Sequence, residues 1–222
     1  MQKRKIIIGD YDTALQGLWT LTGWDLSPAE PIKTFIEVSG RIDGPIDAST
    51  ALTDGDPRYG SRTLTATFES SEGNRLERES RISYMINKLD GWRLNIELPD
   101  DPMHYITGRV HVERLYNDPA HASVRVTAVC DPWKYNKTET AVSLVAEATP
   151  QSVALINLGR RAVVPTLTVT GTSVTLAFGN YTKTLGAGEY LLPDLLIKPG
   201  EVALTYSGDG VVLMTYREAV LE

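Results

Sequence analysis

The segment from Ala122 to Tyr135 constrains the fold more strongly than any other part of this sequence. Its apolar side chains fall on alternate positions: Ala122, Val124, Val126, Ala128 and Cys130. A period of two is typical of a strand with one buried face. Pro132 lacks an amide hydrogen and restricts Asp131 to extended geometry, so the sequence predicts that the strand ends there. The segment therefore predicts a β-rich domain that has Cys130 in its core and that ends near these residues.

One segment has helical periodicity instead. Ile82, Met85, Ile86 and Leu89 follow the spacing i, i+3, i+4, i+7, which is the apolar stripe of an amphipathic helix. Upstream, Asn74 and Glu77 have the spacing of a capping box, and Gly91 follows where a helix stop is expected. These signals predict a single helix over residues 74–89.

Short alternating segments separated by turn residues fill most of the remaining chain. Strands are expected at residues 64–68, 93–98 and 107–115. Beyond a seam at residues 146–151 the composition shifts toward Thr, Val, Leu and Gly, and glycines at residues 171–172 and 207–210 predict turns between short strands. We therefore expect a mainly β protein with one amphipathic helix. Its N-terminal domain is expected to cover residues 1–145, and a C-terminal β-sandwich residues 146–222.

Composition narrows the class of protein. The 222 residues suit one or two domains, and the net charge of −6 argues against a nonspecific nucleic-acid binder. A single cysteine excludes an intrachain disulfide framework and a multi-cysteine zinc site. The isoleucines at residues 6–8 are too few for a signal peptide, and no later stretch reaches the ~20 apolar residues of a membrane span. We expect synthesis in a cytoplasm and no membrane insertion.

The sequence predicts no catalytic, cofactor or metal site. The histidines, His104, His111 and His121, lack the spacing of a metal site. The pair Asp100 and Asp101 lies between prolines, which indicates a turn more simply than an acid/base pair. Asp54 and Asp56 lack the further carboxylates of a calcium loop. Cys130, at an inward strand position, is expected to be a buried thiol and not a nucleophile.

Four segments, at residues 38–47, 58–62, 99–109 and 130–135, resemble in their order the distal tail protein (Dit) family of long-tailed, non-contractile bacteriophages and prophages. The positions that carry the resemblance are Gly40, Gly44, Asp47, Tyr59, Arg62, Tyr105, Gly108, Arg109, Cys130, Pro132 and Trp133. These motifs cover most of residues 30–140. In the second half, Asn157, Gly159, Pro165, Tyr216 and Arg217 are also similar to the family.

The resemblance implies a structural virion protein of the tail tip. In this family the N-terminal domain closes a hexameric ring, and the C-terminal domain is a galectin-like β-sandwich. The ring joins the tail tube protein to the tail-tip or tail-associated lysin protein, and the tape measure protein is a further candidate partner. DNA passes through the ring only as cargo. No cofactor and no enzymatic activity are implied. Because neither half has a long insertion, the sequence resembles the short form without carbohydrate-binding modules.

The resemblance leads to one further hypothesis about charge, and two alternatives to it remain open. A DNA channel favours negative charge, which predicts acidic side chains such as Asp47, Asp54 or Asp56 on the ring lumen. The alternatives to an architectural role are a carbohydrate-binding module and a tail-tip hydrolase. A sugar platform would have to use Tyr181, Tyr190, Tyr206 or Tyr216, because all four tryptophans precede the seam. A hydrolase would need a clustered acid/base pair, and the sequence shows none.

Overall fold

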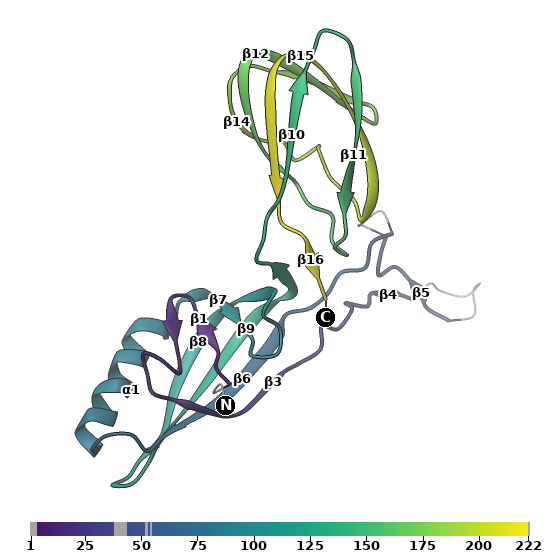
Figure 1. Ribbon diagram of the computed structural model, residues 1–222. Coiled ribbons are helices and arrows are strands. Elements are labelled where there is room, and N and C mark those ends of the chain that lie inside the picture. The colour runs from purple at the N-terminus through teal and green to yellow at the C-terminus, as the bar shows by residue number, and fades with distance from the viewer. Residues whose placement is uncertain (1–3, 38–43, 52, 54, 222) are drawn as a thin grey trace. The chain divides into compact units, whose positions relative to one another are not determined.

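The computed structural model describes residues 4–37, 44–51, 53 and 55–221. Gly40 and Asp54 lie outside the described residues. The chain divides into two compact units, Met1–Lys134 and Tyr135–Glu222. The domain boundary expected after residue 145 stays a prediction; β10 (Thr140–Ala146) pairs along its whole length with a strand of the second unit. The protein is mainly β, with one helix among the described residues (Figure 1).

The first unit is built on a sheet with the strand order β2-β1-β7-β8-β9-β6-β3. The strands are β1 (Ile7–Ile8), β2 (Tyr11–Asp12), β3 (Thr20–Leu26), β6 (Arg62–Ser70), β7 (Arg93–Glu97), β8 (His104–Asn117) and β9 (Ala122–Asn136). The strands expected at residues 64–68, 93–98 and 107–115 are therefore present, and β8 is longer than predicted. Edge strands β2 and β3 end the path, so the sheet does not close on itself.

Helix α1 (Arg75–Leu89) confirms the helical prediction. The side chain of Asn74 accepts a hydrogen bond from the Glu77 amide at 3.0 Å, and the Glu77 carboxylate accepts one from the Asn74 amide at 2.9 Å, which completes the capping box. Ile82, Met85 and Leu89 are fully buried in the core of the first unit. The apolar stripe therefore does what its period predicts and packs the helix on the sheet.

Strand β9 confirms one prediction and corrects another. The alternating residues are all buried, and Cys130 is 2% exposed. The strand does not end at Pro132, however, but continues to Asn136. The reason lies in the pairing: the β6 ladder ends where Arg62 faces Cys130. Pro132 lies beyond that ladder, so its missing amide hydrogen removes no bond to β6.

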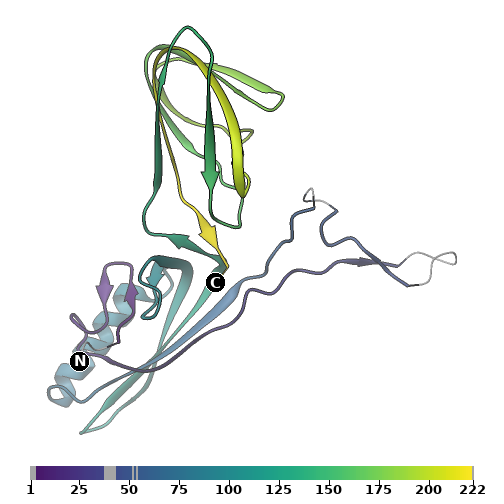
Figure 2. The same cartoon turned by 45° about the vertical axis from the view of Figure 1, so that its right-hand side comes forward.

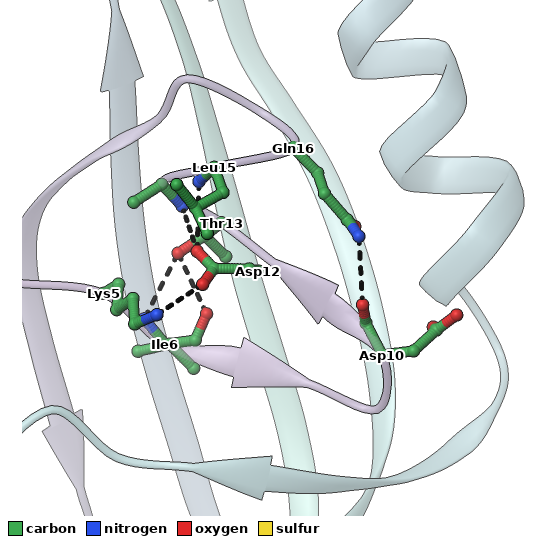
Figure 3. A network of polar contacts seen from close by, with 8 residues as sticks. Lys5, Ile6, Asp10, Asp12, Thr13, Leu15 and Gln16 are labelled. Atoms are coloured by element: carbon green, nitrogen blue, oxygen red, sulfur yellow. Dashed lines mark hydrogen bonds and ion pairs between the residues drawn. The ribbon is translucent and has the colours of Figure 1, made fainter.

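The N-terminal segment is part of the first unit, where a polar network holds β1 and β2 together (Figure 3). The Thr13 hydroxyl donates to the Ile6 carbonyl at 2.9 Å, and Lys5 pairs with Asp12 at 2.5 Å. Asp12 also accepts hydrogen bonds from the amides of Ala14 and Leu15, both at 3.0 Å. Of the three isoleucines at residues 6–8, Ile7 and Ile8 thus form β1, and Ile6 and Ile8 are fully buried.

Residues 30–60, called the arm below, leave the main sheet between β3 and β6 (Figure 2). Backbone hydrogen bonds close its base: the Ile32 amide donates to the Arg58 carbonyl at 2.8 Å and the Gly60 amide to the Glu30 carbonyl at 2.9 Å. Further along, β4 (Phe35–Ile36) and β5 (Ile46–Asp47) pair as a separate two-stranded sheet.

The second unit is a single curled antiparallel sheet that encloses its own core. Its strands are β10, β11 (Gln151–Asn157), β12 (Thr166–Phe178), β13 (Tyr181–Leu185), β14 (Gly188–Leu191) and β15 (Gly200–Tyr216), and β16 (Ala219–Val220) follows and pairs with β9. One half of β15 pairs with β10 and the other half with β11. Likewise β14 and β13 pair with opposite halves of β12. Two long strands thus serve both layers of a β-sandwich.

The expected turns at residues 171–172 and 207–210 are wrong, because both segments lie inside these long strands. The ladder between β12 and β15 shifts register between Gly171 and Ser173, which is a β-bulge. Glycines permit the close approach: a Cβ on Gly208 would lie 2.3 Å from the Ser173 carbonyl oxygen. The glycines therefore lie where the continuous strands β12 and β15 approach each other closely, and they do not end either strand.

Candidate functional site

Three of the sequence-predicted positions meet in one buried row across neighbouring strands β6, β9 and β8. Arg62 faces Cys130 in the β6–β9 ladder. On the other side, a Cβ on Gly108 would lie 2.5 Å from the Cys130 sulfur and 3.1 Å from the Val129 carbonyl oxygen. Only glycine leaves room for the thiol at this point. Packing therefore explains why a glycine lies beside the cysteine in this row.

Arg62 is 4% exposed, although it is charged. Its Nε donates to the Ser27 carbonyl oxygen at 2.7 Å. The Ser27 side chain in turn accepts a hydrogen bond from the Thr63 amide, also at 2.7 Å. These contacts join the chain after β3 to the start of β6, at the base of the arm. Burial of a guanidinium is tolerated when its donors are paired in this way.

The Cys130 thiol is a poor nucleophile in this environment. Burial in the core raises the pKa of Cys130 to about 11. The reactive species of cysteine is the thiolate, which is scarce at neutral pH under these conditions. The structure thus agrees with the interpretation of Cys130 as a core residue.

We expect Cys130 to resist modification in the folded protein. At pH 8, well below a pKa of about 11, the aromatic disulfide DTNB should react only after denaturant is added. Reaction of the native protein as fast as that of the denatured protein would show that the thiol is accessible and ionised. Release of the chromophore at 412 nm measures both rates.

Tyr59 and Trp133, from two separate sequence motifs, are in direct contact. Their rings meet edge to face, with centroids 5.5 Å apart and an interplanar angle of 78°. Tyr59 also bridges to Pro31 through the backbone, so it belongs to the base of the arm. The contact therefore joins the arm to the last residues of β9 in the first unit. Trp133 is only partly buried, so its truncation to alanine should destabilise the protein less than truncation of a fully buried tryptophan would.

A double-mutant cycle tests this pair. Because edge-to-face pairs are worth about 0.5–1.5 kcal/mol beyond buried area, we expect a coupling free energy of that size between Trp133→Ala and Tyr59→Ala. Urea unfolding of the unsubstituted protein, the two single variants and the double variant measures this coupling. Circular dichroism detects the unfolding, because Trp133→Ala removes one of the fluorescent tryptophans. Strictly additive losses would show that the two rings stabilise the fold independently.

The turn at residues 99–102 is tied to the same end of β9 by charge. Asp101 accepts from His104 Nδ1 at 2.7 Å and from Lys134 Nζ at 3.0 Å. Burial alone would raise the pKa of Asp101, but the hydrogen bonds from His104 and Lys134 lower it overall. The adjacent Asp100 pairs with Arg4 at 3.5 Å instead. The two aspartates therefore have different partners and structural roles, and they do not form an acid/base pair.

The other predicted positions of the first unit are spread more widely. Arg109 donates to the Gly91 carbonyl at 2.6 Å, which connects β8 to the end of α1. Tyr105 lies partly buried on β8. Gly44, with a φ of 95°, and Asp47 lie on the arm, and the Asp47 carboxylate accepts the Ser49 amide at 2.9 Å. The motif positions thus divide between a cluster at the end of β9 and the arm.

In the second unit, two of the family-like positions, Asn157 and Arg217, donate to backbone carbonyls. The Asn157 side chain is buried and donates to the carbonyls of Arg161 at 2.8 Å and Ile197 at 3.0 Å, while it accepts from the Gly159 amide at 2.9 Å. Arg217 donates to the carbonyls of Asn136 and Lys137 at 2.7 and 2.5 Å. Residue type alone does not reveal these partners, because they are backbone atoms distant in sequence.

Residues that sequence reasoning missed include a buried arginine on α1. Arg78 is 1% exposed and donates to three backbone carbonyls, those of Gly73 at 2.5 Å and of Asp118 and Pro119 at 2.8 Å. These bonds join the helix start to the turn between β8 and β9. The available signal was its position, four residues before Ile82 on the buried side of the helix.

The described residues contain no group of three or more His, Cys, Asp or Glu side chains arranged to hold a metal ion. His111, for example, contacts only one carboxylate in its ion pair, Asp90 at 2.8 Å. Within the same part of the chain, no helix has the length and apolar character needed to cross a membrane. What the clusters provide is packing and fixed connections between strands.

Comparison with known proteins shows a likeness of fold. No family model matches the sequence, and no curated protein sequence matches it. Among solved structures, the Dit (gp 19.1) protein of SPP1 matches with a TM-score of 0.66 and 15% sequence identity. The match covers 96% of this chain and 98% of that protein, which is described as a paradigm of the hub adsorption apparatus in phages that infect Gram-positive bacteria. At this identity the likeness concerns the fold, and the chain therefore has a Dit-like fold across both of its units.

Proposed function

We propose that this chain is a structural protein of a phage tail tip, in which copies form a hexameric ring that joins the tail tube to the tail-tip or tail-associated lysin protein. The observation that carries the proposal is the likeness to the SPP1 hub protein across almost all of both chains. The tape measure protein is a further candidate partner. The site of action would be the virion tail tip, after synthesis in the host cytoplasm.

Exposed apolar side chains support self-assembly through the first unit. Thirteen of the eighteen large hydrophobic residues that are exposed among the described residues belong to it, including Trp92 at 63% and Met103 at 59%. Aromatic residues and methionine are enriched in protein interfaces. The open sheet edges at β2 and β3 offer unpaired backbone groups as well, which neighbouring copies can cover.

The DNA channel of the proposed ring would be lined by acidic side chains. Asp47 and Asp56 are exposed on the arm. The hydrogen bond from Ser49 lowers the pKa of Asp47, so its carboxylate stays charged well below neutral pH. Negative side chains repel the phosphates of passing DNA. A ring whose lumen is lined mainly by Lys and Arg would contradict this part of the proposal.

The role is proposed to be non-enzymatic and cofactor-free. The carbohydrate-binding alternative has little support in the second unit, where Tyr216 is buried and Tyr181, Tyr190 and Tyr206 are only partly exposed. Stacking on a sugar requires an exposed aromatic face. Binding of the purified protein to a glycan array would favour that alternative, and hydrolysis of cell walls would favour an enzyme.

Negative-stain microscopy combined with light scattering tests the proposed function. We expect hexameric rings, alone or stacked, from the purified protein or after co-expression with the neighbouring tail proteins. A monomer at every concentration under both conditions would contradict a ring subunit. The mass from light scattering distinguishes a hexamer from other closed assemblies.

A further inference from the structure

The arm carries an apolar face whose isoleucine side chains are about half exposed. Ile36 lies directly opposite Ile46 in the β4–β5 ladder, so the two side chains share one face of the ribbon. Thr34 and Ala48, joined by a 2.8 Å backbone hydrogen bond, continue that face. Ile36 is 52% exposed and Ile46 43% exposed. The opposite face is polar by comparison, because Phe35 shares it with Asp47.

The β4–β5 ribbon has little to stabilise it when it is surrounded by water. No described residue of the arm belongs to either hydrophobic core. An isolated two-stranded ribbon is marginally stable, and a third strand or an apolar surface is normally needed to support it. The arm is nevertheless locally ordered, because Ser49 accepts from the Thr34 amide at 2.8 Å and donates its own amide to Asp47 at 2.9 Å. Such a preformed apolar face fits a docking element.

We propose that the Ile36–Ile46 face of the arm docks against the exposed side of α1 in a second copy of this chain. The inference rests on the proposed ring and identifies the contact that would close it. A ring interface is heterologous, so two different patches of one chain must fit each other. The first unit provides a donor, the arm, and an acceptor on α1, whose exposed side carries Leu76 (81% exposed) and Tyr84 (52% exposed) beside the polar Ser80, Ser83 and Asn87.

Charge favours the same pairing. Among its described residues the arm carries four exposed acidic side chains, those of Glu30, Glu37, Asp47 and Asp56, and two exposed basic ones, those of Lys33 and Arg58. Because Arg78 is buried, the surface of α1 carries three basic side chains, Arg75, Arg81 and Lys88, and two acidic ones, Glu77 and Glu79. Opposite potentials on the two surfaces orient the copies as they meet and disfavour contact between two arms or between two helices. Docking through the Ile36–Ile46 face also leaves the face that carries Asp47 free to line the channel.

Cross-linking between two singly substituted chains locates the contact. Full-length Ile46→Cys protein is mixed with full-length Tyr84→Cys protein under conditions in which the unsubstituted chain assembles, and a short bismaleimide is added. We expect a covalent dimer that joins residue 46 of one chain to residue 84 of the other, identified by mass spectrometry. The native Cys130 is buried and should not be labelled. As a control, Ser152→Cys on the second unit replaces Tyr84→Cys and should give no dimer.

A substitution with a matched control tests whether the face drives assembly. Ile36→Asp should raise the concentration needed for half-assembly at least about tenfold, because it places a charge in a central apolar contact. The control is Ile156→Asp on β11, where the isoleucine is 51% exposed in the second unit. It should assemble like the unsubstituted chain. Circular dichroism should show both variants folded, since neither isoleucine belongs to a core.

The outcomes separate the two proposals. Rings from the unsubstituted chain and from Ile156→Asp, but not from Ile36→Asp, would support the arm contact. Rings from all three proteins would overturn it and leave the proposed function intact. Cross-links between two arms, in place of arm to helix, would overturn the assignment of α1 as the acceptor. If the unsubstituted chain never forms rings, even with the tail partners, the proposed function is wrong and the arm contact falls with it.

Discussion

Replacing Arg78 by methionine should destabilise the first unit by about 2–4 kcal/mol. The guanidinium donates to three backbone carbonyls, and each hydrogen bond from a charged group contributes about 1.5–3 kcal/mol net. Water can bind some of these turn carbonyls after the substitution, so the expected loss of stability is smaller than the sum of the three hydrogen bonds. Methionine keeps much of the apolar stem, so the loss reports mainly on the hydrogen bonds. Urea unfolding followed by tryptophan fluorescence measures it.

The control for this change is Arg75→Met, on the same helical turn. Arg75 is exposed, so its replacement should alter stability by less than about 0.5 kcal/mol. Arg78→Lys should fall between the two, because a lysine ammonium cannot reach three carbonyls with the planar fork of arginine. All four tryptophans lie in the first unit, which makes their fluorescence specific to it. Equal losses from Arg75→Met and Arg78→Met would contradict the assigned role of the buried guanidinium.

Local patterns predicted those elements whose own side chains determine them. Helix α1 was predictable because its cap and its apolar stripe both lie within 16 residues. The inward face of β9 was predictable because alternation alone decides which side chains are buried. Arg78 was missed because its partners, the carbonyls of Asp118 and Pro119, are 40 and 41 residues away. Sequence periodicity places the arginine on the buried face and says nothing of what pairs with it.

The errors in the strand predictions share one physical cause. Proline and glycine were interpreted as ends of strands, although their effect depends on what lies across the ladder. Pro132 is tolerated in β9 because the β6 ladder has already ended. Gly171 and Gly208 lie inside β12 and β15, because the two strands approach too closely there for any side chain. The neighbouring strand decides between a turn and a bulge, and a single sequence does not show that neighbour.

The sequence named the motif positions but could not give their contacts. Tyr59 and Trp133 come from motifs that are far apart in the sequence, and only the fold reveals that their rings touch. The same holds for Asp101 and Lys134, which are 33 residues apart. The roles assigned to the motif positions remain predictions. Their contacts favour architecture over chemistry, because they are made to backbone atoms, neighbouring rings or single opposite charges.

The second large effect is expected at Gly208, where β15 passes the bulge in β12. Gly208→Ala should destabilise the second unit by about 3–5 kcal/mol. The residue has a φ of 135°, and a non-glycine residue in such a conformation costs about 1–3 kcal/mol. The new Cβ would also lie 2.3 Å from the Ser173 carbonyl oxygen and 3.0 Å from the Val174 Cα. Both are backbone atoms, so a strand must shift, and overpacking of this kind adds about 1–3 kcal/mol.

Hydrogen exchange measured by mass spectrometry resolves this effect, since the second unit contains no tryptophan. We expect faster exchange throughout β12 and β15 in Gly208→Ala, while the tryptophan fluorescence of the first unit keeps its unfolding midpoint. The matched control is Gly186→Ala, because an added Cβ there meets nothing within 4 Å and the backbone is not in the left-handed region. It should exchange like the unsubstituted protein. Normal exchange in Gly208→Ala would contradict this prediction. It would mean that β12 and β15 can move apart at the bulge without loss of stability.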